Sequence, residues 1–253
     1  MINAPLEQFN ILSILSLKLF SLDISITNFL LMNIIVLILL QSFIYFASSS
    51  TSYLRTSSLL FVTNAWQKFL SISSEFCAQI MADIAVANNQ RYLPVISVLF
   101  NFILFSNLIG LVPYTFTTTS HLFVTFTLSF SVFIGINIIT FQKYKFQIFS
   151  LFLPANTSFL LALVLVPLEF VSHLTKPISL GVRLFINMMA GHTLLKVIVG
   201  FAWSMLLLEN LTSLGLLIPL ITLVVLFSLE LGVALIQTYV FITLTCIYIQ
   251  DGS

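Results

Sequence analysis

Two long stretches without a single charged residue constrain what this chain can fold into. The first lies between Asp23 and Arg55, and the second runs from Tyr92 to Gln142. A membrane-spanning helix needs about 20 consecutive apolar residues. Charged residues make up 7% of the chain, against about 25% in soluble domains. The chain is therefore predicted to be an all-α integral membrane protein. Its net charge of +1 excludes a broad basic surface for nucleic acid.

Breaks in the apolar sequence predict five membrane crossings and one further helix. Residues 24–54 hold the first crossing, and residues 92–142 hold two crossings separated by a turn after Gly110. Residues 55–91 instead predict an amphipathic helix, which lies in the membrane interface or packs on the surface of a partner. The apolar stripe of this helix consists of Phe69, Ile72, Phe76, Ile80 and Ile84.

The last two apolar segments, residues 156–203 and 210–250, are longer than a simple crossing requires. A continuous helix from Asn156 to Gly200 would be about 68 Å long, whereas the hydrocarbon core is about 30 Å thick. The first segment is therefore either two short spans broken near Pro177 and Gly181 or one steeply tilted helix.

The distribution of basic residues in the loops favours the tilted helix. If each of the last two segments crosses once, five loop cations fall on one side of the membrane. These cations are Arg55, Lys68, Arg91, Lys143 and Lys145. Basic loops face the inner side, so the amino terminus is predicted outside, the carboxyl terminus inside, and the last two crossings form a long tilted hairpin.

Polar side chains within the membrane are concentrated in this hairpin. An arginine at bilayer depth costs about 3 kcal/mol and stays protonated, so Arg183 is the first functional candidate. Glu169 lies on nearly the same helical face, whereas His192 points to the opposite face. An antiparallel hairpin brings Glu230 near His192 and Gln237 toward the level of Arg183.

The pattern is two separated sets of titratable groups with a fixed cation between them. Glu169, with His173 and the terminal Asp251, faces the inner side, and His192 and Glu230 face the outer side. Carboxylates and histidine can exchange protons near neutral pH when their surroundings are suitable. Such a chain supports two half-paths for protons that do not connect directly.

Structural alternatives remain open for each of these residues. Arg183 could form an ion pair with Glu230 that locks two helices together. Glu169 could extend to the interface, and His192 could bind a backbone carbonyl. Gln237 could simply link helices through a hydrogen bond.

Two segments resemble the signatures of one family, subunit a of the F-type ATP synthase. They are SLGVRLFINMMAGH, residues 179–192, and LELGVALIQTYVFITLTCIYIQD, residues 229–251. The first is similar to the family pattern R-L-x-x-N-x-x-A-G-H, and the second to E-x-x-x-x-x-x-Q-x-Y-V-F. The stretch FNFILFSNLIGLVPYTFTTTSH resembles the second span of the family, and PLEQF resembles its mitochondrial form in plants or protists.

The resemblance implies a stator subunit that faces a rotating ring of c subunits. Arg183 is then the essential arginine opposite the ring carboxylate. His192, Glu230 and Asn187 belong to the half-channel from the intermembrane space, and Gln237 is the glutamine opposite the arginine. Proton flow through the two half-channels would turn the ring and drive ATP synthesis elsewhere in the complex.

The resemblance also implies the inner half-channel, the partners and the location. Glu169 and Asp251 match its acidic positions, whereas His173 matches no invariant position and is assigned to the inner side by its place alone. The expected partners are the c ring, the peripheral-stalk subunit b, small membrane subunits and lipids such as cardiolipin, in the mitochondrial inner membrane.

No cofactor or metal is predicted. Cys77 and Cys246 match no metal-binding spacing and are interpreted as apolar filler. The sequence has no nucleotide-binding loop of the G-x-x-x-x-G-K-[ST] type, so the chain is not expected to be an enzyme on its own. Two other functions stay open: a proton-translocating subunit of a respiratory complex, and an assembly scaffold without a transport role.

Overall fold

The structure is a computed structural model of the whole chain. It describes residues 5–16, 18–19, 22–23, 25–52, 65–84, 91–112, 115–145, 159–206 and 213–251. The α-helices among these residues are α1 (Asn28–Ser52), α2 (Ala65–Ile84), α3 (Leu93–Gly110), α4 (Leu122–Tyr144), α6 (Phe159–Leu206) and α7 (Ser213–Asp251). All of them except α2 are long and apolar enough to cross a membrane. The all-α membrane fold with five crossings is therefore confirmed.

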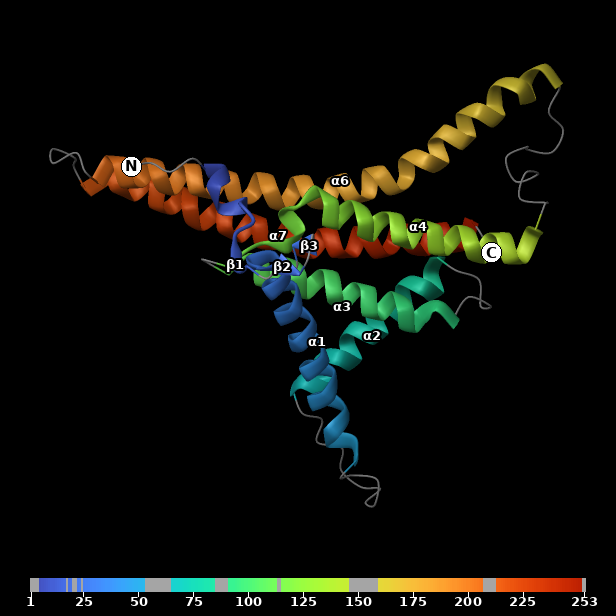
Figure 1. Cartoon of the computed structure of the whole chain (residues 1–253), viewed down its shortest axis with the longest axis horizontal. Helices are drawn as coiled ribbons and strands as arrows, with labels where there is room; N and C mark the ends of the chain where they lie inside the picture. Colours follow the sequence, from blue (N-terminus) through green and yellow to red (C-terminus); the bar gives the residue numbers. More distant parts are fainter. Residues whose placement is uncertain are drawn as a thin grey trace.

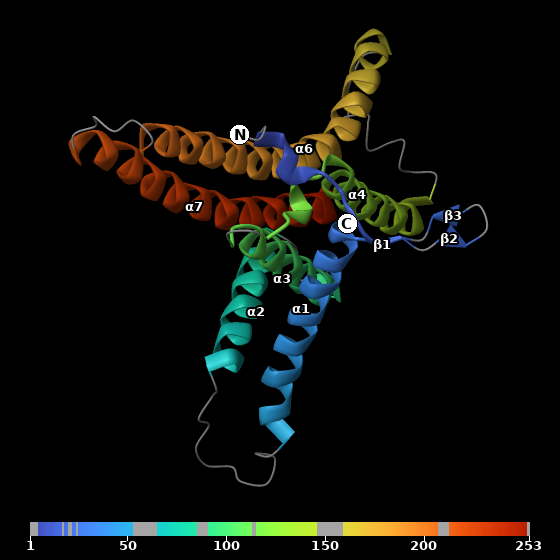
Figure 2. The same cartoon turned by 60° about the vertical axis from the view of Figure 1, so that its left-hand side comes forward.

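Helices α6 and α7 lie side by side along most of their length, with α4 against α6 and α3 against α7 (Figures 1 and 2). Helix α6 is continuous over 48 residues, so the alternative of two short broken spans is wrong. At about 1.5 Å per residue it is about 72 Å long, more than twice the thickness of a bilayer core of about 30 Å. The predicted turn near Glu209 lies outside the described residues.

The amino-terminal part of α6 bends away from the other helices, as its yellow segment in Figure 1 shows. Pro167 and Pro177 lie inside the helix, and proline is the usual cause of such a bend because it removes a backbone hydrogen bond. Neighbouring helices and water can compensate for the freed carbonyl groups in membrane proteins. The prolines therefore bend α6 without ending it.

Helices α4 and α6 approach each other closely at Gly181. A Cβ atom at this position would lie 2.6 Å from Ser129 Oγ and 3.0 Å from the Thr125 carbonyl oxygen. Small residues permit such contacts between membrane helices, where close packing replaces the hydrophobic effect. Gly181 thus fixes the distance between α4 and the part of α6 that carries Arg183.

Helix α2 is not a candidate span, and it packs against α1, α3 and α7 of this chain. Its buried residues are Ser73, Cys77, Ile80 and Met81. Of the predicted apolar stripe, Phe69, Ile72 and Phe76 are exposed, Ile80 is buried and Ile84 is half-buried. The stripe is thus only partly buried, but its aromatic residues still contact the bundle, since the ring of Phe69 lies 5.3 Å from that of Phe43 on α1 and the ring of Phe76 lies 5.8 Å from those of Phe100 on α3 and Tyr239 on α7.

The two cysteines lie in the core between α2 and α7. Both are free and fully buried, and Cys246 Sγ lies 3.4 Å from Met81 Sδ. Burial raises the pKa of the Cys77 thiol to about 11, because a thiolate would lose its hydration there. This packing agrees with their interpretation as apolar filler.

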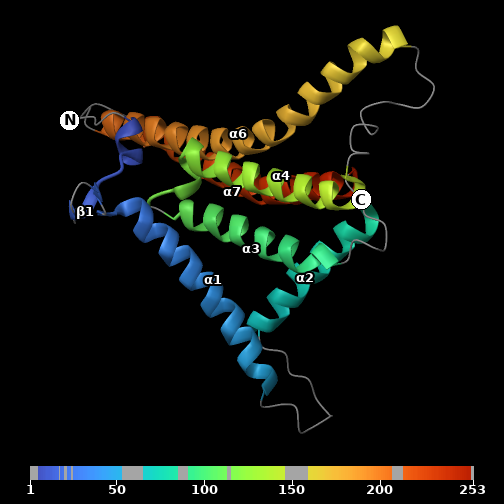
Figure 3. The same ribbon diagram turned by 45° about the vertical axis from the view of Figure 1, so that its right-hand side comes forward.

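Short strands that the sequence did not predict precede α1. Strand β1 (Ser13–Leu15) pairs antiparallel with β4 (Ile26–Thr27), and β2 (Lys18–Leu19) pairs with β3 (Leu22–Asp23). A 3-10 helix, η1 (Pro5–Phe9), comes before them. Figure 3 shows β1 at the amino-terminal end of α1.

Candidate functional site

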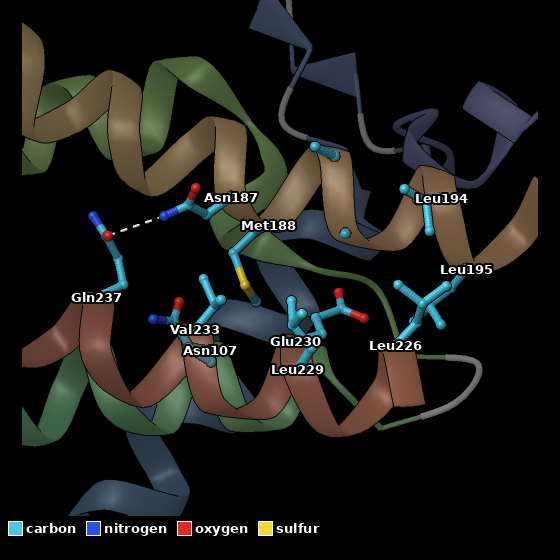
Figure 4. A pocket seen from close by; sticks show the side chains of 13 residues that line it. Asn107, Asn187, Met188, Leu194, Leu195, Leu226, Leu229, Glu230, Val233 and Gln237 are labelled. Atoms are coloured by element: carbon cyan, nitrogen blue, oxygen red, sulfur yellow. Dashed lines mark hydrogen bonds between the residues drawn. The ribbon is translucent and has the colours of Figure 1, made fainter. Parts of the chain in front are cut away.

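A cavity of about 230 Å³ lies between α6 and α7 and is closed on one side by α3. Most of its wall is aliphatic and comes from leucine, valine and alanine side chains of the two long helices. Four polar side chains also line it, namely Asn107, Asn187, Glu230 and Gln237 (Figure 4). The cavity therefore combines a membrane-like wall with a few hydrogen-bonding groups.

His192 and Glu230 face each other beside this cavity, as the antiparallel hairpin predicted. Nε2 of His192 lies 3.6 Å from Oε1 of Glu230, and only 5% of the Glu230 side chain is exposed. This distance is too long for a hydrogen bond. Neither Glu230 carboxylate oxygen nor His192 Nε2 has a hydrogen-bond partner among the described residues.

Gly191 is the reason that Glu230 can approach α6 so closely. A Cβ atom on residue 191 would lie 2.6 Å from Glu230 Oε1 and 2.9 Å from its Cδ. The carboxylate thus occupies the space that a side chain at position 191 would fill. The glycine next to His192 therefore sets the position of Glu230 relative to the histidine.

Asn107 of α3 is a site residue that sequence reasoning missed. Its side chain is 1% exposed, and neither its Oδ1 nor its Nδ2 atom has a partner within the described part of the chain. Buried amide groups are normally hydrogen-bonded, since an unpaired polar atom costs about 1–3 kcal/mol. An asparagine in the mostly apolar stretch 93–110, close to the Gly110 turn, was the available signal.

Asn187 and Gln237 link the two long helices across the cavity. Nδ2 of Asn187 donates a hydrogen bond of 3.0 Å to Oε1 of Gln237 (Figure 4). Gln237 is 4% exposed, and its Nε2 atom has no partner among the described residues. Gln237 therefore forms a hydrogen bond between the two helices, and its other amide atom is left for a further partner.

The cavity has the properties of a hydrated space. Side chains with unpaired polar atoms, those of Asn107, Glu230 and Gln237, line it, and its volume is sufficient for several water molecules. Purely apolar cavities stay dry, whereas a roomy cavity with two to four polar partners holds water. Water molecules here would satisfy the groups that the protein leaves unpaired.

Arg183 projects from α6 on an exposed surface. It makes no hydrogen bond or ion pair within the part of the chain that the structure describes. Since the carboxylate of Glu230 faces His192, the alternative of an ion pair between Arg183 and Glu230 is wrong for the described residues. The guanidinium group is thus available to a partner outside this chain.

The predicted inner residues lie far from the cavity. His173 is half-buried, and its Nε2 atom lies 3.1 Å from Oδ1 of Asn137 on α4. Glu169 is half-buried one turn earlier, about 34 Å along α6 from His192 at about 1.5 Å per residue. Asp251 is the last residue of α7, and its side chain lies outside the described residues.

The structure therefore brings some of the predicted residues together and keeps others apart. His192, Glu230, Asn187 and Gln237 meet around one cavity, and Glu169 and His173 lie toward the other end of α6. Arg183 lies between these sets along the helix. Among the described residues, no group of three or more His, Cys, Asp or Glu side chains is arranged to hold a metal ion.

Comparisons with known proteins show the family of the chain. A family model described as ATP synthase A chain matches residues 29–250. A protein of Pylaiella littoralis named ATP synthase subunit a is 47% identical over 252 residues, covering 100% of this chain and 98% of that protein. Proteins with the same name from Marchantia polymorpha and Chondrus crispus are each 42% identical, over 98% and 99% of this chain and 97% and 96% of their own lengths.

The match covers the described helices α2, α3, α4 and α6 in full, and α1 and α7 except for one terminal residue each. It also excludes the respiratory-complex alternative, because the similarity spans the whole chain and names a different complex. By these sequence matches, the chain belongs to the ATP synthase A chain family, and it is a membrane-sector subunit of the ATP synthase.

Proposed function

We propose that this chain conducts protons to and from a rotating ring of c subunits through two half-channels that do not meet. The observation that carries the proposal is the polar cavity of about 230 Å³ between α6 and α7, with His192 and Glu230 beside it. A hydrated cavity bordered by a titratable pair is a suitable path for protons. The family membership supports proton transport as the activity.

On the outer side, protons enter the cavity and reach Glu230 and His192. Nε2 of His192 and the carboxylate of Glu230 are 3.6 Å apart, and these atoms have no hydrogen-bond partner among the described residues, so each is free to exchange protons with water. Asn107, Asn187 and Gln237 hold and orient the water molecules. From this cavity a proton passes to a carboxylate of the c ring, which becomes neutral and can then turn into lipid.

Arg183 keeps the two half-channels separate. Its permanent positive charge opposes the passage of a proton or another cation, since like charges repel strongly where the dielectric constant is low. It also attracts the ring carboxylate in its ionised form and thereby favours release of the proton. Its exposure without a partner in the described chain supports this contact with the ring.

On the inner side, the released proton leaves past Glu169 and His173 toward Asp251. The half-buried positions of Glu169 and His173 on α6 support this route. Each elementary charge that crosses the membrane provides about 2.3 kcal/mol per 100 mV. This energy turns the ring and drives ATP synthesis in another part of the complex, so the chain itself carries no enzyme activity.

The partners and location follow from the same proposal. The chain acts in the mitochondrial inner membrane with the c ring, subunit b, small membrane subunits and lipids such as cardiolipin. Its amino terminus faces the intermembrane space and its carboxyl terminus the matrix. The excess of Lys and Arg in the loops of one side supports this orientation.

The test uses the intact complex in lipid vesicles with the variants Arg183→Ala and Glu230→Gln. Arg183→Ala should abolish proton-driven ATP synthesis and allow a passive proton leak, while the complex stays assembled. Glu230→Gln should lower ATP synthesis without a proton leak. The matched control is Glu75→Gln, on the exposed face of α2, which should keep normal activity. Normal ATP synthesis in Arg183→Ala would contradict the proposal that Arg183 separates the two half-channels. Loss of assembly with a normal proton flux per assembled complex would favour the scaffold function.

A further inference from the structure

An exposed aliphatic segment lies beside the amino-terminal end of α1; it consists of β1 (Ser13–Leu15) with the two residues before it and is called the aliphatic strand below. Four of its residues carry aliphatic side chains that are more than half exposed, namely Ile11 (55%), Leu12 (66%), Ile14 (55%) and Leu15 (56%). Successive side chains of a strand point to opposite faces. Because Ile14 and Leu15 are neighbours and both exposed, this chain covers neither face of the strand. Aliphatic surface of this kind is unfavourable in water.

Hydrogen bonds fix the depth of this strand relative to the membrane. The backbone N–H of Asn28 donates to the Leu12 carbonyl oxygen at 3.1 Å. The Asn28 side chain accepts a bond from the Leu12 N–H at 3.1 Å and donates one to the Asn10 carbonyl oxygen at 3.2 Å. Asn28 is also the first residue of the candidate span in α1. Leu12 is therefore held at the level where the membrane crossing begins.

The rest of the aliphatic strand stays close to that level. Leu15 pairs with Ile26. Ile26 comes two residues before the first residue of the span, a distance of about 7 Å at about 3.3 Å per residue. The polar zone on each side of a bilayer is about 5–8 Å thick, because the whole bilayer is about 40–45 Å and its core about 30 Å. The strand thus lies within this zone whatever its tilt.

The exposed surface of the strand continues onto a surface that faces lipid. Leu30, Leu31 and Ile34 on the first turns of α1 are also exposed and belong to the candidate span. The unpaired backbone groups on the free edge of β1 can still bind water at headgroup depth, which they could not do in the hydrocarbon core. The exposed aliphatic surface and the backbone groups that can bind water are both compatible with a position at the boundary between lipid and water.

We propose that residues 11–15 form a membrane anchor, which inserts its aliphatic side chains between the acyl chains and headgroups on the side where α1 begins. The partner is a lipid surface. The anchor would hold the start of α1 at a fixed depth through the bonds to Asn28. This inference is independent of the proton path.

The test places a nitroxide spin label at Leu12→Cys in the intact complex in phosphatidylcholine vesicles. Cys77 and Cys246 are fully buried, so labelling of this chain should be confined to the introduced thiol. The spectrum of an identically treated complex without that thiol is subtracted. Ile34→Cys gives the lipid-exposed reference, and Glu7→Cys, at an exposed polar position, gives the water-exposed reference. Collision rates with oxygen and with a water-soluble nickel chelate are then compared.

The expected ratio of oxygen to nickel collisions at position 12 is several-fold higher than at position 7 and close to the ratio at position 34. Ile14→Cys should give the same result, because both faces of the strand meet lipid. A ratio equal to that at position 7 would mean that the strand lies in water and would overturn the proposal. Protection from both reagents at position 12 would equally overturn it, because it would mean that another protein subunit covers the strand.

Discussion

Substituting Gly191 with alanine tests whether the position of Glu230 matters for proton conduction. The added Cβ atom would lie 2.6 Å from Glu230 Oε1 and 3.1 Å from its Cγ, whereas ordinary contacts begin at 3.4 Å. The carboxylate must therefore move by about 0.8 Å, the difference between 3.4 and 2.6 Å. Displacing a reacting group by about 1 Å can reduce a rate by about 100-fold. We expect proton-driven ATP synthesis to fall by about tenfold to 100-fold.

The fold should tolerate this substitution. Alanine is favoured over glycine inside a helix by about 0.5–1 kcal/mol, and overpacking typically costs about 1–3 kcal/mol. The lower end of that cost applies, since the crowded atoms belong to the free end of a flexible glutamate. The two effects nearly cancel, and the complex should assemble normally.

The assay is ATP synthesis by the intact complex in vesicles under an imposed proton gradient, together with its thermal stability. Gly200→Ala is the matched control, because Gly200 lies on the same helix and an added Cβ atom there would meet nothing within 4 Å. The control should keep normal synthesis. If Gly191→Ala conducts protons as well as Gly200→Ala, the position of Glu230 beside His192 is unimportant and the proposed outer path is wrong.

Three further predictions follow from single side chains. Asn107→Leu removes two buried polar atoms that water in the cavity would satisfy, so it should change thermal stability little and yet slow proton conduction; unchanged conduction would remove Asn107 from the path. Glu169→Gln should slow proton release on the inner side, and proton flux equal to wild type at every pH would favour the interpretation that Glu169 only extends to the interface. The pKa of the Cys77 thiol is raised to about 11, so the thiol stays protonated at mildly alkaline pH. It should therefore resist N-ethylmaleimide until the protein is denatured, which mass spectrometry can check. Rapid modification in the folded complex would show that the thiol is accessible.

Sequence reasoning predicted the elements whose signal lies within one continuous stretch. Apolar length alone identified the five spans. The positive-inside rule favoured a single α6 although Pro177 and Gly181 lie inside it. The spacing along two antiparallel helices was enough to bring Glu230 near His192, since the pairing depends only on the turn near residue 209 and on a fixed rise per residue.

The features that sequence reasoning missed depend on which helix surfaces contact each other in the folded chain. Asn107 comes from α3, and nothing in its local sequence says that this turn of α3 faces α7. The packing of α2 within the bundle could not be predicted from its apolar stripe. In a membrane protein the lipid is as apolar as the core, so Phe76 can be partly exposed and still lie against Phe100, while Ser73 and Cys77 are buried.

The same reasoning explains why the key cation cannot be understood from this chain alone. Holding Arg183 at bilayer depth costs about 3 kcal/mol, and the described residues supply no anion to offset that cost, because Glu230 is directed to His192. Gly181, two residues before Arg183, holds α6 tightly against α4, so the helix cannot easily rotate to carry the guanidinium group into the cavity. We therefore expect the compensating negative charge to come from outside the described residues, and the proposed ring carboxylate meets this requirement, because it can pair with Arg183 while it is ionised and leave when it is protonated.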